Sequence, residues 1–213
     1  MSSVADWLNT LNDFGFDDVD TADKLGLIQS AIWDIEAREP WYFLEQVLTL
    51  TFSGASAVPS NLPADMRAVR RITNRVTGRR VGFKRVEDLE DRDPLGLDTV
   101  GTPVCFYFEA GQLRVYRVPA ATDTLRLRYF QISDAITAAT PEIDILIPPR
   151  HHAAVLYGSL ALHYARDDDF ELASYWDGKM EQRIQNMRAD LWQRQFDTTD
   201  YIVVVDPDDW DYE

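Results

Sequence analysis

Residues 101–130 carry the feature that most restricts the fold, because side chains there are expected to alternate between two faces in three successive short stretches. A repeat of two residues is typical of a strand that buries one face, whereas a helix repeats every 3.6 residues. Gly111 lies in the first turn, and Pro119 ends the second stretch. We therefore predict three strands, over residues 104–108, 113–118 and 125–130.

Helical patterns lie on both sides of this β unit. A helix is predicted over residues 20–38, with Asp20 or Thr21 as its N-cap. A second helix is predicted over residues 151–164, and a third begins near Phe170. In the third helix, apolar residues recur every three or four positions for more than five turns: Phe170, Ala173, Trp176, Met180, Ile184, Met187 and Leu191. A β unit within an otherwise helical chain indicates a mixed α+β class.

The region between the first helix and residue 101 adds further strands. Residues 40–52 begin with an aromatic cluster and finish with alternation, which predicts a short helical turn that passes into a strand. Residues 69–73 and 81–86 are typical of a strand pair around a turn. We interpret residues 87–98 as a polar connection. Five or six strands are enough for a small sheet or sandwich with its own core.

Charge is distributed unevenly. The net charge is −15, yet residues 66–86 carry 8 of the 21 basic residues and no acidic one. The remaining acidic body does not suit tight wrapping around nucleic acid, because its charges repel phosphates. The basic strip has three interpretations: a solvated hairpin, a contact with an acidic patch of a neighbouring subunit, or passing contact with DNA phosphates. Its candidate interface residues are Arg70, Arg71, Arg75, Arg79, Arg80, Lys84 and Arg85.

Residues that could support catalysis or bind a metal are not arranged for either. His152 and His163 lie about 16 Å apart along one helix, too far to share a metal. The aspartates of residues 206–211 lack the glycine and the closing glutamate of a calcium loop. The chain has no phosphate-binding glycine loop, nucleophile elbow or zinc spacing. We interpret Cys105 as a small apolar residue of a strand. We expect no enzyme, no cofactor and no metal.

The sequence also bears on compartment and on the C-terminal segment. No apolar run approaches the roughly 18 residues of a membrane span, and the first residues lack the features of a secretory signal. Residues 201–205 form a β-prone run, followed by the acidic sequence DPDDWDYE. Such a run pairs with its own domain or with a partner. The candidate interface residues here are Tyr201, Ile202, Val203, Val204, Val205 and Trp210.

Four features, taken in order, resemble the head-to-tail connector (adaptor) proteins of tailed bacteriophages. The first is the helix that closes in an aromatic cluster, AIWDIEAREPWYFLE. The second is LPADMRAVRRI, a proline and aspartate that lead into a strand. The third is the three-strand stretch of residues 101–130. The fourth is the helical pair with an acidic junction, IPPRHHAAVLYGSLALHYARDDDFELASYWDGKMEQRIQNMRADL. The resemblance covers roughly residues 20–195.

The resemblance implies an α+β fold in which an antiparallel helical bundle carries an inserted small antiparallel β-sheet or sandwich. It implies a ring, commonly of twelve copies, in the neck of the virion, after synthesis in the host cytoplasm. The ring would contact the portal protein and a tail or stopper protein, and DNA would pass through it without its sequence being read. We expect one domain over residues 1–196, with helical parts over 4–52 and 150–196, a β-rich insertion over 53–148, and an acidic interaction tail over 197–213.

Two other functions stay open. The chain could be a stopper or tail-side ring protein of the same particle. It could also be a small acidic protein-binding module, which would be a stable monomer whose binding weakens with salt. For a ring protein, the outward arginines of the β unit join the basic strip as candidates for subunit contacts: Arg114, Arg126 and Arg128.

Overall fold

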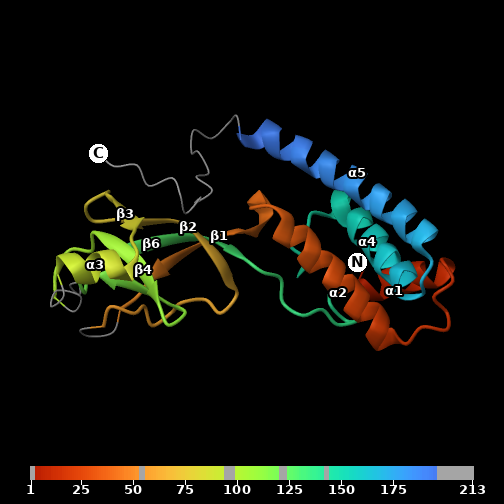
Figure 1. The fold of residues 1–213 in the computed structure, drawn as a ribbon, viewed down its shortest axis with the longest axis horizontal. Coiled ribbons are helices and arrows are strands. Elements are labelled where there is room, and N and C mark those ends of the chain that lie inside the picture. The colour runs from red at the N-terminus through yellow and green to blue at the C-terminus, as the bar shows by residue number, and fades with distance from the viewer. Residues whose placement is uncertain (1–2, 53–55, 94–98, 120–123, 142–143, 196–213) are drawn as a thin grey trace. The chain divides into compact units, whose positions relative to one another are not determined.

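The computed structural model describes residues 3–52, 56–93, 99–119, 124–141 and 144–195 (Figure 1). They form two compact units. The helical unit comprises the described parts of residues 1–44 and 132–195, and the sheet unit comprises those of residues 45–131. Each unit has its own buried core.

Among the described residues, the helical unit contains four α-helices and the short 3-10 turns η1 and η3. Ser3 and Asp6 form a capping box at the start of α1, and the Asp20 carboxylate accepts from the backbone N–H of Ala22 at the start of α2. Helix α4 packs along both α2 and α5 (Figure 1). The elements are α1 (Val4–Asp13), α2 (Thr21–Arg38), η1 (Tyr42–Leu44), η3 (Pro149–His151), α4 (His152–Arg166) and α5 (Phe170–Gln195).

Gly158 lies at a tightly packed position among these helices. A Cβ atom added to Gly158 of α4 would lie 2.9 Å from Sδ of Met180 on α5 and 3.0 Å from Cβ of Ala31 on α2. A larger residue there would have to displace the Met180 side chain and press on Ala31, so glycine favours the tight packing of α4 against α2 and α5. Ser159, which follows it, is fully buried and donates to the carbonyl of Val155 at 2.9 Å.

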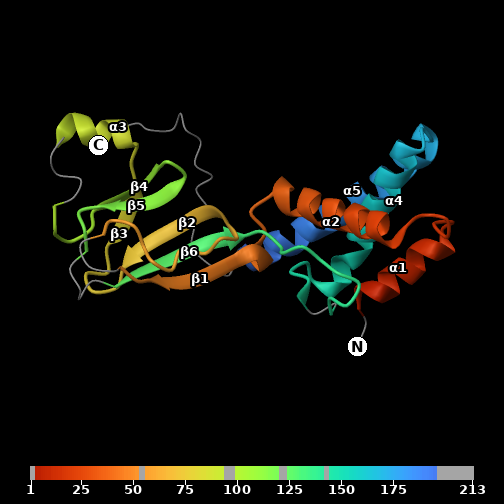
Figure 2. The same cartoon turned by 90° about the horizontal axis from the view of Figure 1, so that it is seen from below.

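The sheet unit contains one six-stranded sheet in the order β1-β6-β2-β3-β4-β5 (Figure 2). All neighbouring strands are antiparallel except β3 and β4, which are parallel. Helix α3 lies between β3 and β4 in sequence and packs on β4. The elements are β1 (Glu45–Leu50), β2 (Met66–Asn74), β3 (Arg80–Phe83), α3 (Val86–Arg92), β4 (Cys105–Glu109), β5 (Gln112–Tyr116) and β6 (Leu125–Gln131).

Alternation along the strands builds the core of this unit. One face of the sheet curls around a buried cluster: Leu50, Ile72, Val81, Phe106, Leu113, Val115, Leu125, Leu127 and Tyr129. On the opposite face of β4, Cys105 and Tyr107 pack against Leu89 of α3. The prediction that Cys105 is a buried apolar residue is confirmed.

The expected fold of a helical bundle with a small antiparallel insertion is wrong. The structure has a six-stranded curled mixed sheet and, among the described residues, five α-helices. The error arises between residues 84 and 104. Helix α3 lies in the connection between β3 and β4, and the two strands pair in parallel. The sequence pattern of this region indicated only a polar connection. Alternation of side chains is the same in parallel and antiparallel strands, so it could not reveal the direction.

Most individual elements match the predictions. The three helices predicted from residues 20, 151 and 170 correspond to α2, α4 and α5. The turn that passes into a strand corresponds to η1 and β1, and the remaining predicted strands correspond to β2, β3, β4, β5 and β6. In α5, Ala173, Met180, Ile184 and Met187 are buried as expected, but Phe170 is 67% exposed. Leu191 lies outside the described side chains.

Candidate functional site

Arginines gather on the outer face of the part of the sheet formed by β1, β6 and β2. In the pairing of β6 with β2, Arg128 lies opposite Arg71, and Arg126 lies opposite Thr73. Arg80 of β3 lies on the other side of Thr73. An open pocket of about 230 Å³ forms at this surface, lined by Arg71, Thr73, Arg75, Arg126 and Arg128.

The alternation of β6 explains this placement. Leu125, Leu127 and Tyr129 enter the core, so the arginines between them must point to the other face. Two arginines then face each other across neighbouring strands. Like charges in directly opposite positions destabilise a sheet, so the arrangement costs folding free energy.

Glu45 of β1 supplies a carboxylate to this face. Its Oε1 lies 2.6 Å from Nε of Arg128, and its other oxygen pairs with Arg70. The register of β2 shifts between Val69 and Arg71, so Arg70 has no partner residue on β6. Its guanidinium instead reaches Glu45, two strands away. The side chains of Glu45 and Arg70 are only 13% and 16% exposed. We call the whole surface the arginine face: Arg70, Arg71, Arg75, Arg80, Arg126 and Arg128.

The seven candidate residues of the basic strip therefore lie in different places in the structure. Four of the seven lie on the arginine face. Arg79 is exposed in the turn between β2 and β3, and Arg85 is exposed just before α3. Lys84 is half-buried, and its backbone N–H donates to the carbonyl of Phe106 at 2.9 Å. The remaining candidates lie outside the described residues: Tyr201, Ile202, Val203, Val204, Val205 and Trp210.

The three outward arginines of the β unit also separate. Arg126 and Arg128 join the arginine face, whereas Arg114 of β5 pairs with Glu109 of β4 at 3.0 Å. The repeated Leu-Arg pattern in β6 was the signal for the first two. Nothing in the sequence distinguished Arg70 from Arg71, because a bulge between neighbouring positions decides which residue meets Glu45.

A second charged surface lies at one end of the helical unit. The connection between α1 and α2 and the junction between α4 and α5 lie together there (Figures 1 and 2). The ring of Phe16 contacts that of His163 with centroids 3.9 Å apart, and Oη of Tyr164 donates to the carbonyl of Phe14 at 3.4 Å. We call this surface the acidic end, which has nine exposed carboxylates: Asp13, Asp17, Asp18, Asp20, Asp23, Asp167, Asp168, Asp169 and Glu171.

Sequence reasoning interpreted part of the acidic end only as a helix start. Two clusters of aspartate, over residues 13–23 and 167–171, were its signal. Their meeting depends on contacts of Phe14 and Phe16 with α4 and α5, which sequence alone does not show. Where the structure is described, no group of three His, Cys, Asp or Glu residues could hold a metal ion. The acidic end is therefore a charged surface.

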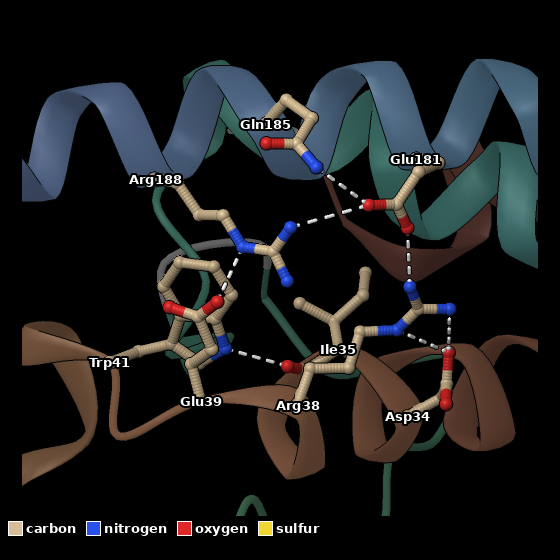
Figure 3. A network of polar contacts seen from close by, with 8 residues as sticks. All are labelled: Asp34, Ile35, Arg38, Glu39, Trp41, Glu181, Gln185 and Arg188. Atoms are coloured by element: carbon tan, nitrogen blue, oxygen red, sulfur yellow. Dashed lines mark hydrogen bonds and ion pairs between the residues drawn. The ribbon is translucent and has the colours of Figure 1, made fainter.

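A polar network fastens α5 to the end of α2 (Figure 3). Arg38 of α2 lies 2.8 Å from Asp34 and 2.6 Å from Glu181 of α5. Arg188 of α5 pairs with Glu39 and lies 3.4 Å from Glu181. Burial tends to lower the pKa of Arg38, but Asp34 and Glu181 outweigh it and raise that pKa. These contacts fix the two helices side by side.

Groups with reactive potential are buried in packing positions. Burial raises the pKa of the Cys105 thiol to about 11, so the thiol is neutral at pH 7. Burial, together with the charge of Arg150, lowers the pKa of His151. Its Nε2 lies 3.0 Å from Nε of Arg150 and 3.1 Å from Oδ2 of Asp190. No helix in the described parts of the chain is long and apolar enough to cross a membrane.

The comparisons with known proteins give one family. A search of curated proteins finds no match to this chain. The family model described as SU10 adaptor protein matches residues 1–204, nearly the whole sequence. That family comprises phage head-to-tail adaptor proteins, in agreement with the resemblance that the sequence features indicated. The chain therefore belongs to the SU10 adaptor protein family.

Proposed function

We propose that this protein is a head-to-tail adaptor that forms a ring in the virion neck and joins the portal protein to the tail or stopper protein. The observation that carries the proposal is the match to the SU10 adaptor family over residues 1–204. The protein would be made in the host cytoplasm and would act through its interfaces, without catalysis, cofactor or metal. DNA would pass through the ring without its sequence being read.

The division of charge between the two units supports this proposal. Residues 45–131 contain 13 basic and 10 acidic residues, whereas the rest of the chain contains 8 basic and 26 acidic ones. A chain with one basic and one acidic region can associate head to tail, and head-to-tail contacts generate rings when the rotation closes. A net acidic protein around a channel does not hold DNA back.

We assign the contacts of this adaptor to the basic strip and the C-terminal segment. Arginine and lysine side chains of residues 66–86 would meet acidic surfaces of neighbours. Residues 197–213 would serve as an interaction segment that binds a neighbouring protein. A chain that ends at Phe196 should then keep the far-ultraviolet circular dichroism expected of the folded units but assemble poorly.

The direct test is to mix the purified chain with the portal protein of its phage. We expect a stoichiometric complex by native mass measurement and a ring in electron micrographs. The absence of any stoichiometric complex would contradict the proposal. Cross-linking within particles separates the adaptor from the stopper, because an adaptor cross-links to the portal protein and a stopper only to other neck or tail proteins.

A further inference from the structure

We propose that the arginine face of one copy docks against the acidic end of the helical unit of a second copy. This inference rests on the proposed ring, since it names the two surfaces that neighbouring copies would use. The occupant of the arginine face is then another copy of this chain, and the recognised chemistry is a cluster of aspartate and glutamate carboxylates.

The arginine face has the character of a binding surface. Its pocket is lined by four arginines and one threonine, and Arg71 stands directly opposite Arg128 across two strands. Glu45 offsets part of this like-charge pairing through Arg128, and a cluster of anionic partner groups would offset the remaining positive charge of the face. Among the described residues, the structure gives no ion pair to Arg75 or Arg126. Both side chains are exposed, so their guanidinium groups are accessible to a partner.

The acidic end supplies a matching partner. All nine of its carboxylate residues are exposed. The basic residues in the same two connections are Arg166 and the buried Lys24, which donates to Asn12 at 2.6 Å. Ring contacts of Phe14 and Phe16 with α4 and α5 hold the two connections together. The carboxylates thus form a preformed surface, which lowers the entropy cost of binding.

The two surfaces lie on different units of the chain, so their contact is heterologous: one surface of each copy meets the other surface of the next. Arginine binds carboxylates with paired, planar hydrogen bonds. A duplex of DNA offers phosphates to the same arginines, but the net charge of −15 opposes its approach. The charge balance therefore favours a second copy as the occupant.

The test compares two full-length interface variants, each with a matched control variant, by sedimentation at low salt. R75Q/R126Q removes two charges from the arginine face, and its control, R117Q/R183Q, removes two exposed charges outside both the arginine face and the basic strip. D17N/D18N/D168N removes three of the nine carboxylate charges of the acidic end, and D88N/E90Q/D91N on α3 is its control. Asn suits position 168, where the backbone has a φ of 61°. We expect each interface variant to self-associate about tenfold or more weakly than the wild type and than its control.

Mixing the two interface variants gives a sharper result. Each retains one intact surface, so together they should form a one-to-one pair that cannot extend, while each variant alone stays monomeric. A wild-type chain that stays monomeric at low salt across all concentrations would overturn the inference. The same holds for variants that associate like the wild type, or for a mixture that does not pair.

Two further measurements separate this inference from its alternatives. If R75Q/R126Q weakens binding of a 20-base-pair DNA duplex but leaves self-association unchanged, the arginine face takes phosphates and the inference is wrong. If both interface variants form normal rings on the portal protein, the inference fails while the proposed function stands. If the wild type forms no portal complex, the proposed function fails whatever the variants do.

Discussion

Glu45 decides how much positive charge the sheet tolerates. Its carboxylate lies between Arg70 and Arg128 and is mostly shielded from water, so it neutralises charges that solvent cannot fully screen. Glu109 and Arg114 form a comparable pair, but both side chains are at least one-third exposed. Burial therefore distinguishes two ion pairs that look alike in sequence.

The substitution Glu45→Gln should lower the free energy of unfolding by about 2 kcal/mol or more, because it leaves two guanidinium groups without their shared counter-charge. The matched control is Glu109→Gln, which breaks an exposed pair and should cost less than about 1 kcal/mol. Urea titration of both variants against the wild type measures the difference. Equal losses would show that burial of Glu45 does not matter.

His151 makes stability depend on pH. Burial and Arg150 lower its pKa in the folded chain below the ordinary value of 6.5. As pH falls through 6.5, the unfolded chain takes up a proton first, so the free energy of unfolding falls until the folded-state pKa is passed. Above pH 7 this group is neutral in both states and contributes no pH dependence.

We expect His151→Gln to reduce the loss of stability between pH 7.5 and pH 5. Denaturant titrations of variant and wild type at both values give the measurement. The variant's stability at pH 7.5 separately reports any loss of packing or hydrogen bonding. An unchanged pH dependence in the variant would mean that His151 titrates normally in the folded protein.

At the scale of elements, periodicity located the helices and strands, and non-local contacts decided the rest. The pattern of residues 101–130 predicted β4, β5 and β6: β5 and β6 each bury one face of their alternating sequence, whereas β4 is apolar on both faces and packs on both. The direction of β4 depended on where α3 carried the chain, so the predicted fold class was wrong. Helix α1 was not assigned, although Ser3 and Asp6 form a capping box that signals its start.

The candidate site divides in the same way. The outward direction of Arg126 and Arg128 could be predicted from alternation within one strand. The role of Arg70 could not, because it depends on a bulge, and the acidic end could not, because it joins connections about 150 residues apart. The sequence shows which residues are charged. Which charged residues come together depends on the tertiary structure.

Packing of α2, α4 and α5 can be tested at Gly158. The substitution Gly158→Ala should destabilise the chain by about 1–3 kcal/mol, because its Cβ would overlap atoms of Met180 and Ala31. Gly26→Ala is the control, since a Cβ there meets nothing within 4 Å and alanine favours the helix. Thermal unfolding should rank Gly26→Ala above the wild type and Gly158→Ala below it. A neutral Gly158→Ala would contradict this prediction and would mean that Met180 and Ala31 adjust to the added Cβ at no cost.

For the whole molecule, the main feature is two cores on one chain. Glu45, the first residue of β1, pairs with Phe130 near the end of β6. The chain therefore enters and leaves the sheet at neighbouring positions. All six strands pair within this segment. Its hydrophobic cluster is likewise formed by residues 45–131. The sheet unit therefore has the properties of an independently folding insertion.

Residues 45–131, produced alone, should fold into a cooperative β-rich unit, because the pairing and core lie within the segment. Circular dichroism and a dispersed amide spectrum would show this, and a single unfolding transition in urea would establish cooperativity. The same segment carrying Glu45→Gln serves as a control, since it should unfold at lower urea. An unfolded isolated segment would show that its core needs the helical unit.

The two segments that connect the helical unit to the sheet unit, before residue 45 and after residue 131, have contacts with a mechanical consequence. After the sheet, the backbone N–H of Ser133 donates to the Glu36 carboxylate, and its carbonyl accepts from the indole N–H of Trp33. The backbone N–H of Ile136 donates to the side-chain oxygen of Gln29. Before the sheet, Trp41 is buried and bonds to the carbonyl of Ile35 at 2.6 Å. Hydrogen bonds therefore link both connecting segments to α2. A pulling force on the sheet unit would reach α2 through both connecting segments. Several hydrogen bonds would share this force, so α2 would bear most of the load within the helical unit.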